Sequence, residues 1–446
     1  MKRLIRLLVL GMVVMASPPS ALEAKPLSLS EVYHKALDYD ARIRAAKADN
    51  QAYSEEIGKA RAQLRPSLRA SLSRGRNTTE SNTLGYDGMV SNTKSYNAFN
   101  YGISVRQPLL NIYSVVGYQQ SKAIVAKSDA QLEKELSTLI IRIVEVYCNA
   151  LLAEDNLLYS KAHTQATKAQ LKQAQLRYNK GFGTITEINE AKAACDLALA
   201  DEVAHRNSVE YNRRELERLI GFYPNELSQL QPEKIVLRQP EPTSVEAWIQ
   251  MARSSSPSII AATHEMEVAR KEVVKQKASR YPTIDLVAGR TYSKSDNNYS
   301  IGSTYDTYYV RLQANVPLYM GGYVSSMVRQ AKAKRVKAEE QLSMQERQAE
   351  SDVRQYYNAI VSSMAQIKAY EQAEKSEAIA LAGTEKGFKV GLRSNVDVLT
   401  ALQKYYDSKR ALAKARYEYI LNRFLLKDAT GTLLEDDLEE LNSWFN

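Results

Sequence analysis

The sequence predicts an α+β membrane protein in which long antiparallel α-helices form a coiled-coil barrel and four strands per chain contribute to a β-barrel. Three observations lead to this fold class. The chain carries an internal two-fold repeat of roughly two hundred residues. Each copy holds a helix-forming stretch of about 70 residues, and each also holds two segments in which apolar and polar residues alternate.

The repeat links residues 29–221 with residues 245–431. Residues that fix the backbone recur in it at constant spacing: Pro66 with Pro282 at 216 residues, and Gly181 with Gly391 and Gly221 with Gly431 at 210. Helical stretches rich in Ala, Glu, Lys and Gln resemble one another in any case, but Pro and Gly impose breaks for steric reasons. Their constant spacing therefore favours a duplication.

The first 24 residues are typical of a secretory signal peptide. Lys2, Arg3 and Arg6 precede an apolar run at 7–16, and small residues follow up to Ala24. A buried N-terminal helix is the alternative. The apolar run is too short to cross a bilayer, and we expect no transmembrane helix in the rest of the chain. After the signal peptide at 1–24 we distinguish four parts: a first repeat at 25–221, a connecting equatorial segment at 222–243, a second repeat at 244–431 and a C-terminal tail at 432–446.

Charge and motif content argue against nucleic-acid binding and catalysis. The net charge is +9, but the basic residues are interspersed with acidic ones instead of gathering on one face. No HExxH, CxxC, GxGxxG or P-loop motif occurs. The four histidines are scattered through helical stretches, where we expect them to be solvated: His34, His163, His205 and His264. We therefore predict no catalytic residue, no cofactor, no metal site and no nucleic-acid partner.

Each repeat contains one very long helix between two shorter ones. The stretch 109–179 has no Pro and a single Gly, and an apolar seam with heptad spacing runs through Leu132, Leu136, Leu139, Ile143 and Val146. The second repeat matches it from 318 to about 387. Shorter helices of about 36 residues each are expected at 29–64, 185–220, 245–279 and 395–429. Two of these placed end to end equal one long helix, so we predict a tall helical wall. Cys148 and Cys195 would stand at different heights in it, too far apart for a disulfide.

Between the first short helix and the long helix of each repeat, the hydrophobic period changes to two, as in strands. The alternating apolar residues are Leu68, Ala70 and Leu72, then Phe99, Tyr101, Ile103 and Val105, and in the second repeat Ile284, Leu286 and Ala288, then Tyr308, Val310 and Leu312. We expect Pro108 and Pro317 to end the strands and to lie in the first turn of the next helix. The segments 77–96 and 293–307 resemble exposed hairpin loops.

Four strands cannot close a barrel alone, since even small barrels take about eight. A membrane barrel has no free edge, so several chains must contribute to it. The 28 tyrosines, against six Phe and two Trp, are frequent around the strands. They are explained either by an aromatic girdle at the membrane interface or by the strand propensity of Tyr.

Over nearly its whole mature length the chain resembles the TolC-like outer-membrane export channels. The resemblance rests on the duplicated layout, on Pro66 and Pro282 before the strands, on Gln107-Pro108-Leu109 and Val316-Pro317-Leu318 after them, and on the two helix reversals. It implies a homotrimer whose twelve strands form one barrel in outer-membrane lipid and whose twelve helices form a periplasmic tunnel. It also implies two partners, a periplasmic adaptor (membrane fusion) protein and an inner-membrane pump.

The resemblance further implies that the helix reversals form the tunnel tip where the adaptor docks. Val390, Gly391 and Leu392 match the docking signature of the family, and Gly181, Phe182 and Gly183 are its weaker counterpart in the first repeat.

The periplasmic entrance gate is implied by the same resemblance. Asp397 corresponds to an acidic position that narrows the closed entrance, where three copies form a ring that attracts cations. Arg393 matches a residue that latches neighbouring helices, with Thr186 and Glu187 as its partners. Phe388 replaces a frequent hydrogen-bonding Tyr, and Thr400 stands where some members carry a second Asp, so we expect a weaker latch and a shallower cation block. An ordinary solvated pair near a helix cap is the alternative for Asp397 and Arg393.

The expected function is a passive exit duct at the cell outer membrane, with a tunnel extending into the periplasm. An ABC transporter or a proton-driven pump would supply the energy, and opening would follow from untwisting of the helix pairs. Overall likeness favours type I protein secretion, with multidrug or small-molecule efflux as the alternative. A structural periplasmic coiled-coil tether is the alternative from another class, although a tether needs no strands.

Overall fold

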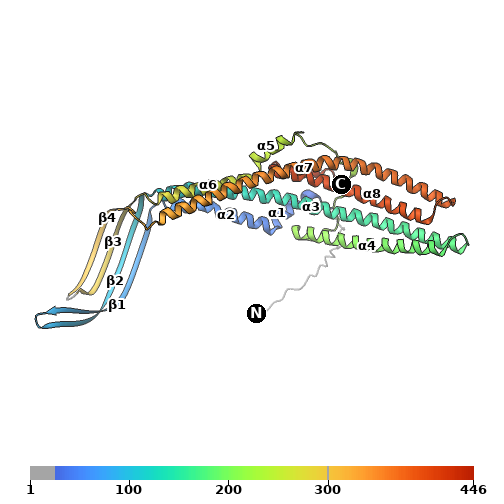
Figure 1. Ribbon diagram of the computed structural model, residues 1–446. Coiled ribbons are helices and arrows are strands. Elements are labelled where there is room, and N and C mark those ends of the chain that lie inside the picture. Colours follow the sequence, from blue (N-terminus) through green and yellow to red (C-terminus); the bar gives the residue numbers. More distant parts are fainter. Residues whose placement is uncertain (1–25, 299–300, 446) are drawn as a thin grey trace, which may run out of the picture.

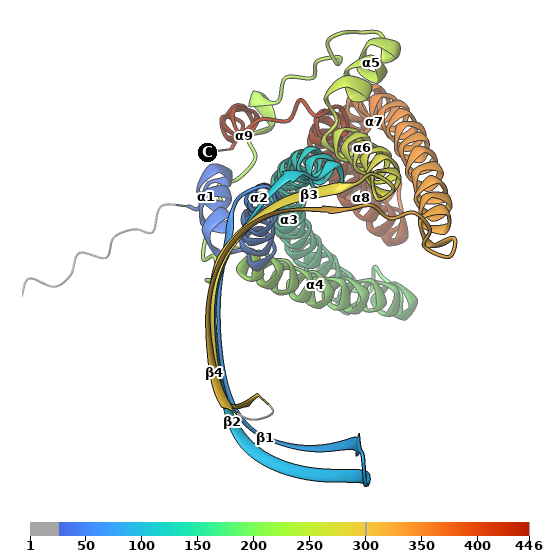
Figure 2. The ribbon, with the colours of Figure 1, turned by 90° about the vertical axis from the view of Figure 1, so that its left-hand side faces the viewer.

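The computed structural model describes residues 26–298 and 301–445, and it shows an elongated helical body with an arm of four strands at one end (Figure 1). The arm curves in an arc when viewed along the body (Figure 2). The predicted signal peptide at 1–24 lies outside the described residues.

Two long helices run the length of the helical body. α3 spans Ile112–Asn179 and α7 spans Tyr323–Lys389, 68 and 67 residues, so each is about 100 Å long at roughly 1.5 Å per residue. Four shorter helices flank them in two tiers (Figure 1). The tier near the strands consists of α2 (Ala41–Ala62) and α6 (Pro257–Ala278), and the far tier of α4 (Ile185–Ile220) and α8 (Asn395–Thr430). The predicted helical wall is confirmed.

Two helices expected to be continuous are interrupted. The helix expected at 29–64 is split at Asp40 into α1 (Leu29–Tyr39) and α2, and the one expected at 245–279 is split at Ser256 into α5 (Val245–Ser255) and α6. At the second break, Pro257 takes the first position of α6, where no intrahelical N–H bond is lost. Because Pro is disfavoured inside a helix, the continuous helix expected across Pro257 was wrong.

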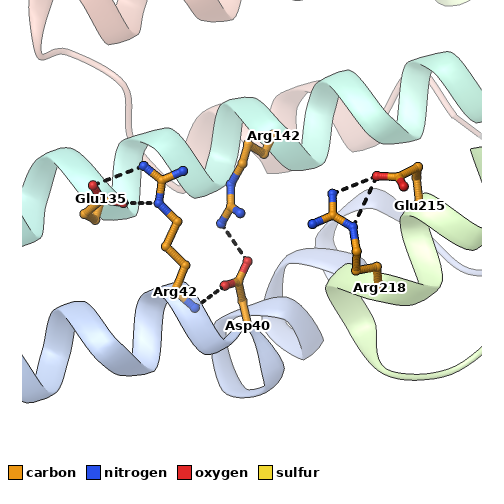
Figure 3. A network of polar contacts seen from close by, with 6 residues as sticks. All are labelled: Asp40, Arg42, Glu135, Arg142, Glu215 and Arg218. Carbon is orange, nitrogen blue, oxygen red and sulfur yellow. Dashed lines mark hydrogen bonds and ion pairs between the residues drawn. The ribbon is translucent and has the colours of Figure 1, made fainter.

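The first break is held by a polar network (Figure 3). Asp40 caps α2 by accepting the Arg42 amide at 2.6 Å, and its other carboxylate oxygen binds the guanidinium of Arg142 on α3 at 2.6 Å. Arg42 in turn pairs with Glu135 of α3 at 2.7 Å. The Asp40 side chain is only 7% exposed, so the break is fixed to α3 by a nearly buried charge pair.

The four strands form one antiparallel sheet in the order β1-β2-β3-β4. β1 spans Ser67–Gly85, β2 Gly88–Leu110, β3 Thr283–Asn298 and β4 Ile301–Asn315. Each repeat therefore supplies one hairpin, and the hairpins pair through β2 and β3. The outer edges, along β1 and β4, have no strand partner among the described residues.

Two expectations about the strand ends were wrong. The segments 77–96 and 293–307 are mostly strand. Their strands were missed because polar residues at successive positions show no apolar and polar alternation. Pro108 lies within β2, and α3 begins only at Ile112 with Asn111 as its cap. Pro317 likewise precedes α7 by several residues, so neither proline starts a helix.

The register puts apolar residues of all four strands in rows on one face of the sheet. One row runs across Leu68, Val105, Ala288 and Val310. The next runs across Ala70, Ile103 and Tyr308 and contains one charged residue, Arg290 of β3. Many of these side chains are exposed, Val310 at 76%. We call this the apolar face. The opposite, polar face carries Ser71, Gly102 and Ser104.

The main hydrophobic core lies halfway along the helical body. There the connecting segment and the C-terminal tail, with the 3-10 turn η1 (Pro232–Lys234) and α9 (Asp436–Asn442), wrap α3. The Tyr147 ring packs edge-on against Phe445, and its hydroxyl donates to the carbonyls of Leu27 and Ser228, each at 3.0 Å. Burial raises the pKa of the Tyr147 phenol.

Two further expectations about α3 need correction. It contains a stretch that is long and apolar enough to cross a membrane, but half of that stretch is buried against other helices, as suits a core helix. His163 is 9% exposed and packs against the ring of Tyr406, so it is not a solvated surface residue, and burial lowers its pKa. Cys148 and Cys195 are both buried free thiols, and burial raises the pKa of Cys148 to about 12.

Candidate functional site

The helix turns that carry the predicted gate and docking residues lie together at the end of the helical body opposite the sheet (Figure 1). The first turn joins α3 to α4, and the second joins α7 to α8. Both use the same backbone arrangement. A glycine with positive φ follows each long helix, +79° at Gly181 and +83° at Gly391. The next amide then bonds back five residues, at 2.9 Å in the first turn and 2.8 Å in the second.

The short helices that leave the turns are capped by side chains. Thr184 accepts the amide of Glu187 at 3.2 Å at the start of α4. Ser394 accepts the amide of Asp397 at 3.1 Å at the start of α8, and Asp397 returns a bond from the Ser394 amide at 2.9 Å. These hydrogen bonds from Ser394 lower the pKa of Asp397. Asp397 is therefore a capping-box residue within the chain, and its carboxylate is ionised at neutral pH.

Apolar side chains project from both turns. Phe182 is 76% exposed, Val390 70% and Leu392 81%. Large apolar residues gathered at one exposed end are typical of surfaces that bind another protein. The predicted docking residues, Gly181 and Gly183 included, therefore lie on one accessible tip.

An exchange of Arg and Gly distinguishes the two turns. Arg177 precedes Gly183 in the first, and the equivalent positions in the second hold Gly387 and Arg393. In each turn the arginine stem lies over the glycine. A Cβ on Gly183 would come within 3.3 Å of the Arg177 Cβ, and a Cβ on Gly387 within 2.8 Å of the Arg393 Cγ. Each turn therefore has room for one arginine. It precedes the turn in the first repeat and follows the turn in the second.

Arg177 connects the two turns. Its guanidinium lies over the ring of Phe388 at 4.7 Å and donates to the Phe388 carbonyl at 3.5 Å and to the Phe182 carbonyl at 3.4 Å. The Phe388 ring is 3% exposed and packs with Val398 and Leu402 of α8. Phe388 thus supports the arginine with its face, although it lacks the hydroxyl expected of a tyrosine there. Thr400 is exposed on α8.

A second connection joins the starts of α4 and α8. The Asn395 side-chain amide donates to the Glu187 carbonyl at 3.4 Å, and Asn395 is 1% exposed. Three buried polar atoms close to the turns have no hydrogen-bond partner among the described residues: Nε of Arg177, Oε2 of Glu187 and Oδ1 of Asn395. Buried groups of this kind normally find a partner. Within the described part of one chain, Arg393 makes no hydrogen bond or ion pair with Thr186 or Glu187.

The sequence did not predict that Arg177 and Asn395 connect the two turns. An arginine in the last turn of a helix is ordinary, because it opposes the helix dipole, and Asn is an ordinary residue at a helix start. The exchange of Arg177 and Gly183 for Gly387 and Arg393 at equivalent positions of the repeat was a signal that pointed to Arg177.

The sequence and the fold are similar to those of known proteins. The sequence profile of the family described as outer membrane efflux protein matches residues 32–222 and 248–432, which is most of both repeats. The chain belongs to the outer membrane efflux protein family. The matched ranges begin and end close to the boundaries of the two structural repeats.

Among relatives of this outer membrane efflux protein, the alkaline protease secretion protein AprF of Pseudomonas aeruginosa is 32% identical over 419 residues, covering 94% of this chain and 87% of AprF. The outer membrane protein TolC of Escherichia coli is 33% identical over 426 residues, covering 93% and 84%. Among solved structures, the outer-membrane channel OprN matches with a TM-score of 0.78 at 16% identity, covering 91% and 90%. VceC of Vibrio cholerae matches with 0.75 at 18%, covering 90% and 96%.

These likenesses confirm the fold, the outer-membrane location and the function of an outer-membrane exit channel. The family is a transport family, not a family of enzymes.

Proposed function

We propose that three copies of this chain form the exit duct of a tripartite export system, which carries its substrate passively from the periplasm to the exterior. The observation that carries the proposal is the difference between the two ends of the molecule. A sheet with an apolar face, whose outer edges have no strand partner among the described residues, stands at one end, and two helix turns with exposed apolar side chains stand at the other.

The sheet supports an assembly of several copies, and the resemblance implies three. Four strands with free outer edges cannot stay in lipid, because backbone groups there need partners. Pairing β1 of one copy with β4 of the next satisfies both edges. Three copies give twelve strands, an even number within the range of outer-membrane barrels.

The entrance is assigned to the turns. A ring of three ionised Asp397 carboxylates would attract cations to a narrow opening. The exposed guanidinium of Arg393 supplies a group that a neighbouring copy can bind when the entrance is shut, with Glu187 as the partner that the resemblance implies. Thr186 lies beside Glu187 and belongs to the same latch.

The partners are assigned to the exposed tip. Phe182, Val390 and Leu392 present an apolar surface that fits a periplasmic adaptor protein. The adaptor would connect the duct to an inner-membrane ABC transporter or proton-driven pump. We assign the cargo to the polypeptide class of type I secretion, because AprF and the proteases secretion protein PrtF of Dickeya chrysanthemi, 29% identical, bear those names.

Purified protein in a planar bilayer tests the duct. We expect a trimer that migrates differently before and after heating and that conducts single-channel current. A monomer that never conducts would contradict the proposal and leave the tether.

The gate is tested by Asp397→Asn. Removing three carboxylates should weaken the block of current by divalent cations, whereas Asp196→Asn, an exposed position further up α4, should leave it unchanged. If the block is the same in all three proteins, Asp397 does not line the constriction.

Deletion of the chain in its source organism tests the cargo. Loss of a secreted polypeptide with unchanged sensitivity to small toxic molecules supports type I secretion. The opposite result assigns the duct to small-molecule efflux.

A further inference from the structure

Basic residues lie at the outer end of the apolar face. The row near the outer limit of the pairing between β2 and β3 joins Arg74 of β1, Phe99 of β2 and Lys294 of β3 by direct register. Arg76 follows two residues further along β1, on the same face. These three cations therefore share one face and nearly one height.

The row just below them is aromatic. Tyr101 and Tyr292 are register partners whose rings stack at 4.8 Å, and Phe99 meets the Tyr292 ring edge-on at 6.5 Å. Rings of this kind mark the level where hydrocarbon gives way to headgroups. Successive rows are about 7 Å apart along a strand, so the cations stand at the depth of lipid headgroups.

The three cations differ from the neighbouring Arg290 in the contacts that the structure describes. Arg290, one row below the tyrosines, is already held by both oxygens of Asp306, at 2.9 and 2.7 Å. Arg74, Arg76 and Lys294 form no ion pair with any residue whose side chain the structure describes, and Arg74 and Lys294 are exposed. Guanidinium and ammonium groups bind phosphate oxygens with charge-assisted hydrogen bonds.

We propose that Arg74, Arg76 and Lys294 form a docking surface for the phosphate-bearing headgroups of lipids in the outer leaflet. This surface rests on the proposed function, since that places the hairpin tips outside and the apolar face in lipid. It goes beyond that function because it assigns a lipid partner to a specific part of the barrel exterior.

The experiment uses the purified full-length assembly in detergent and an acylated disaccharide lipid that carries two phosphate groups. Its affinity is compared with that of the same lipid without phosphates and with inorganic phosphate in large excess. Each cation near an anionic headgroup contributes roughly fivefold to binding. Replacing two, Arg74→Gln with Lys294→Gln, should weaken binding about 25-fold, and the exchange Arg74→Lys with Lys294→Arg should retain most of it.

The matched control is Arg69→Gln with Lys94→Gln, on the polar face of the first hairpin, and it should bind like the parent protein. Equal binding by the Arg74/Lys294 glutamine variant, equal loss in the control, or full displacement of the lipid by inorganic phosphate would each overturn the proposal. Current through the parent protein in a zwitterionic bilayer is recorded on the same preparation. Failure of the duct is therefore separable from failure of the lipid surface.

Discussion

Asp428 is a carboxylate in an unfavourable place. It stands near the C-terminal end of α8, where the helix dipole disfavours negative charge. It lines a cavity of about 270 Å³ together with Lys134, Ser256 and Asp352. Burial raises its pKa to about 6, although Lys134 opposes the shift.

Asp428 should therefore make stability depend on pH. Its pKa in the folded chain lies above the unfolded value near 3.9, so the folded chain favours the protonated carboxyl. The stability that this preference contributes is fully present below about pH 4 and is lost as pH rises through about 6. We expect Asp428→Asn to raise the free energy of unfolding by about 1 to 3 kcal/mol at pH 7.5, with partial exposure reducing the effect, and to change little at pH 4. Thermal denaturation at both pH values measures this, with Asp196→Asn as control. A variant that is no more stable at pH 7.5 would show that the ionised group is well solvated.

Arg177 is expected to hold the entrance shut. Arg177→Gln removes the contact with the Phe388 ring and the bonds to two carbonyls on different turns. A loss of about 1.4 kcal/mol would raise the open fraction of a mostly closed channel about tenfold. Single-channel recording measures this, and Lys172→Gln, exposed on the same helix, should behave like the parent. An unchanged open fraction would mean that the turns separate without breaking these contacts.

At the level of elements, the ends of α4 and α8 pack against the two helix breaks. A Cβ on Gly221 would lie 2.6 Å from the Tyr39 ring, and a Cβ on Gly431 would lie 2.1 Å from the carbonyl oxygen of Ser255. A ring can turn aside, but a backbone carbonyl cannot move without shifting the end of α5. The two contacts are equivalent in the repeat and differ in what can yield.

Gly431→Ala should therefore destabilise the chain more than Gly221→Ala. Backbone strain and overpacking together are expected to cost about 2 to 5 kcal/mol at Gly431, and less at Gly221. Gly383→Ala, inside α7 with open space around it, should be neutral or stabilising. Resistance to proteolysis and melting temperature rank the three variants. Equal effects at Gly221 and Gly431 would show that the Ser255 carbonyl moves freely.

The helices were predictable where breakers are missing and unpredictable where a side chain makes the break. The lengths of α3 and α7 follow from stretches without Pro. The split at Asp40 depends on its carboxylate, which caps α2 and binds Arg142 of α3. A contact between residues so far apart in the chain is not visible in the local sequence. Pro257 did signal the second split. The gate was predicted by resemblance, whereas Arg177 joins residues 211 positions apart and needed the folded chain.

At the scale of the whole molecule, duplication produced two junctions of opposite charge. Asp40, Arg142 and Arg218 in the first repeat correspond to Ser256, Asp352 and Asp428 in the second. The first junction is closed by the ion pair between Asp40 and Arg142, whereas the second is the hollow lined by Asp352 and Asp428. The two halves of the wall are therefore built alike but stabilised differently.

The apolar face should tolerate charge far less than the polar face. Val310→Lys places an ammonium group in the middle of the apolar rows and should cost about 2 to 4 kcal/mol, seen as less heat-resistant trimer in membranes. Gln313→Lys, three residues along β4 on the polar face, should assemble normally. Equal assembly of both variants would contradict the assignment of the apolar face to lipid.

The unequal length of the two hairpins fixes how deeply the sheet is inserted in the membrane. Beyond the pair of Ala98 and Ser295, β1 and β2 continue as a ribbon of two strands, while β3 and β4 soon turn back. Along most of that ribbon the edge of β2 that faces away from β1 has no strand partner among the described residues, because β3 ends at Asn298. Unmatched backbone groups require water. The pair of Ala98 and Ser295 therefore marks the level above which the strands must be in water. The hydrogen-bond register sets this level, independently of hydropathy.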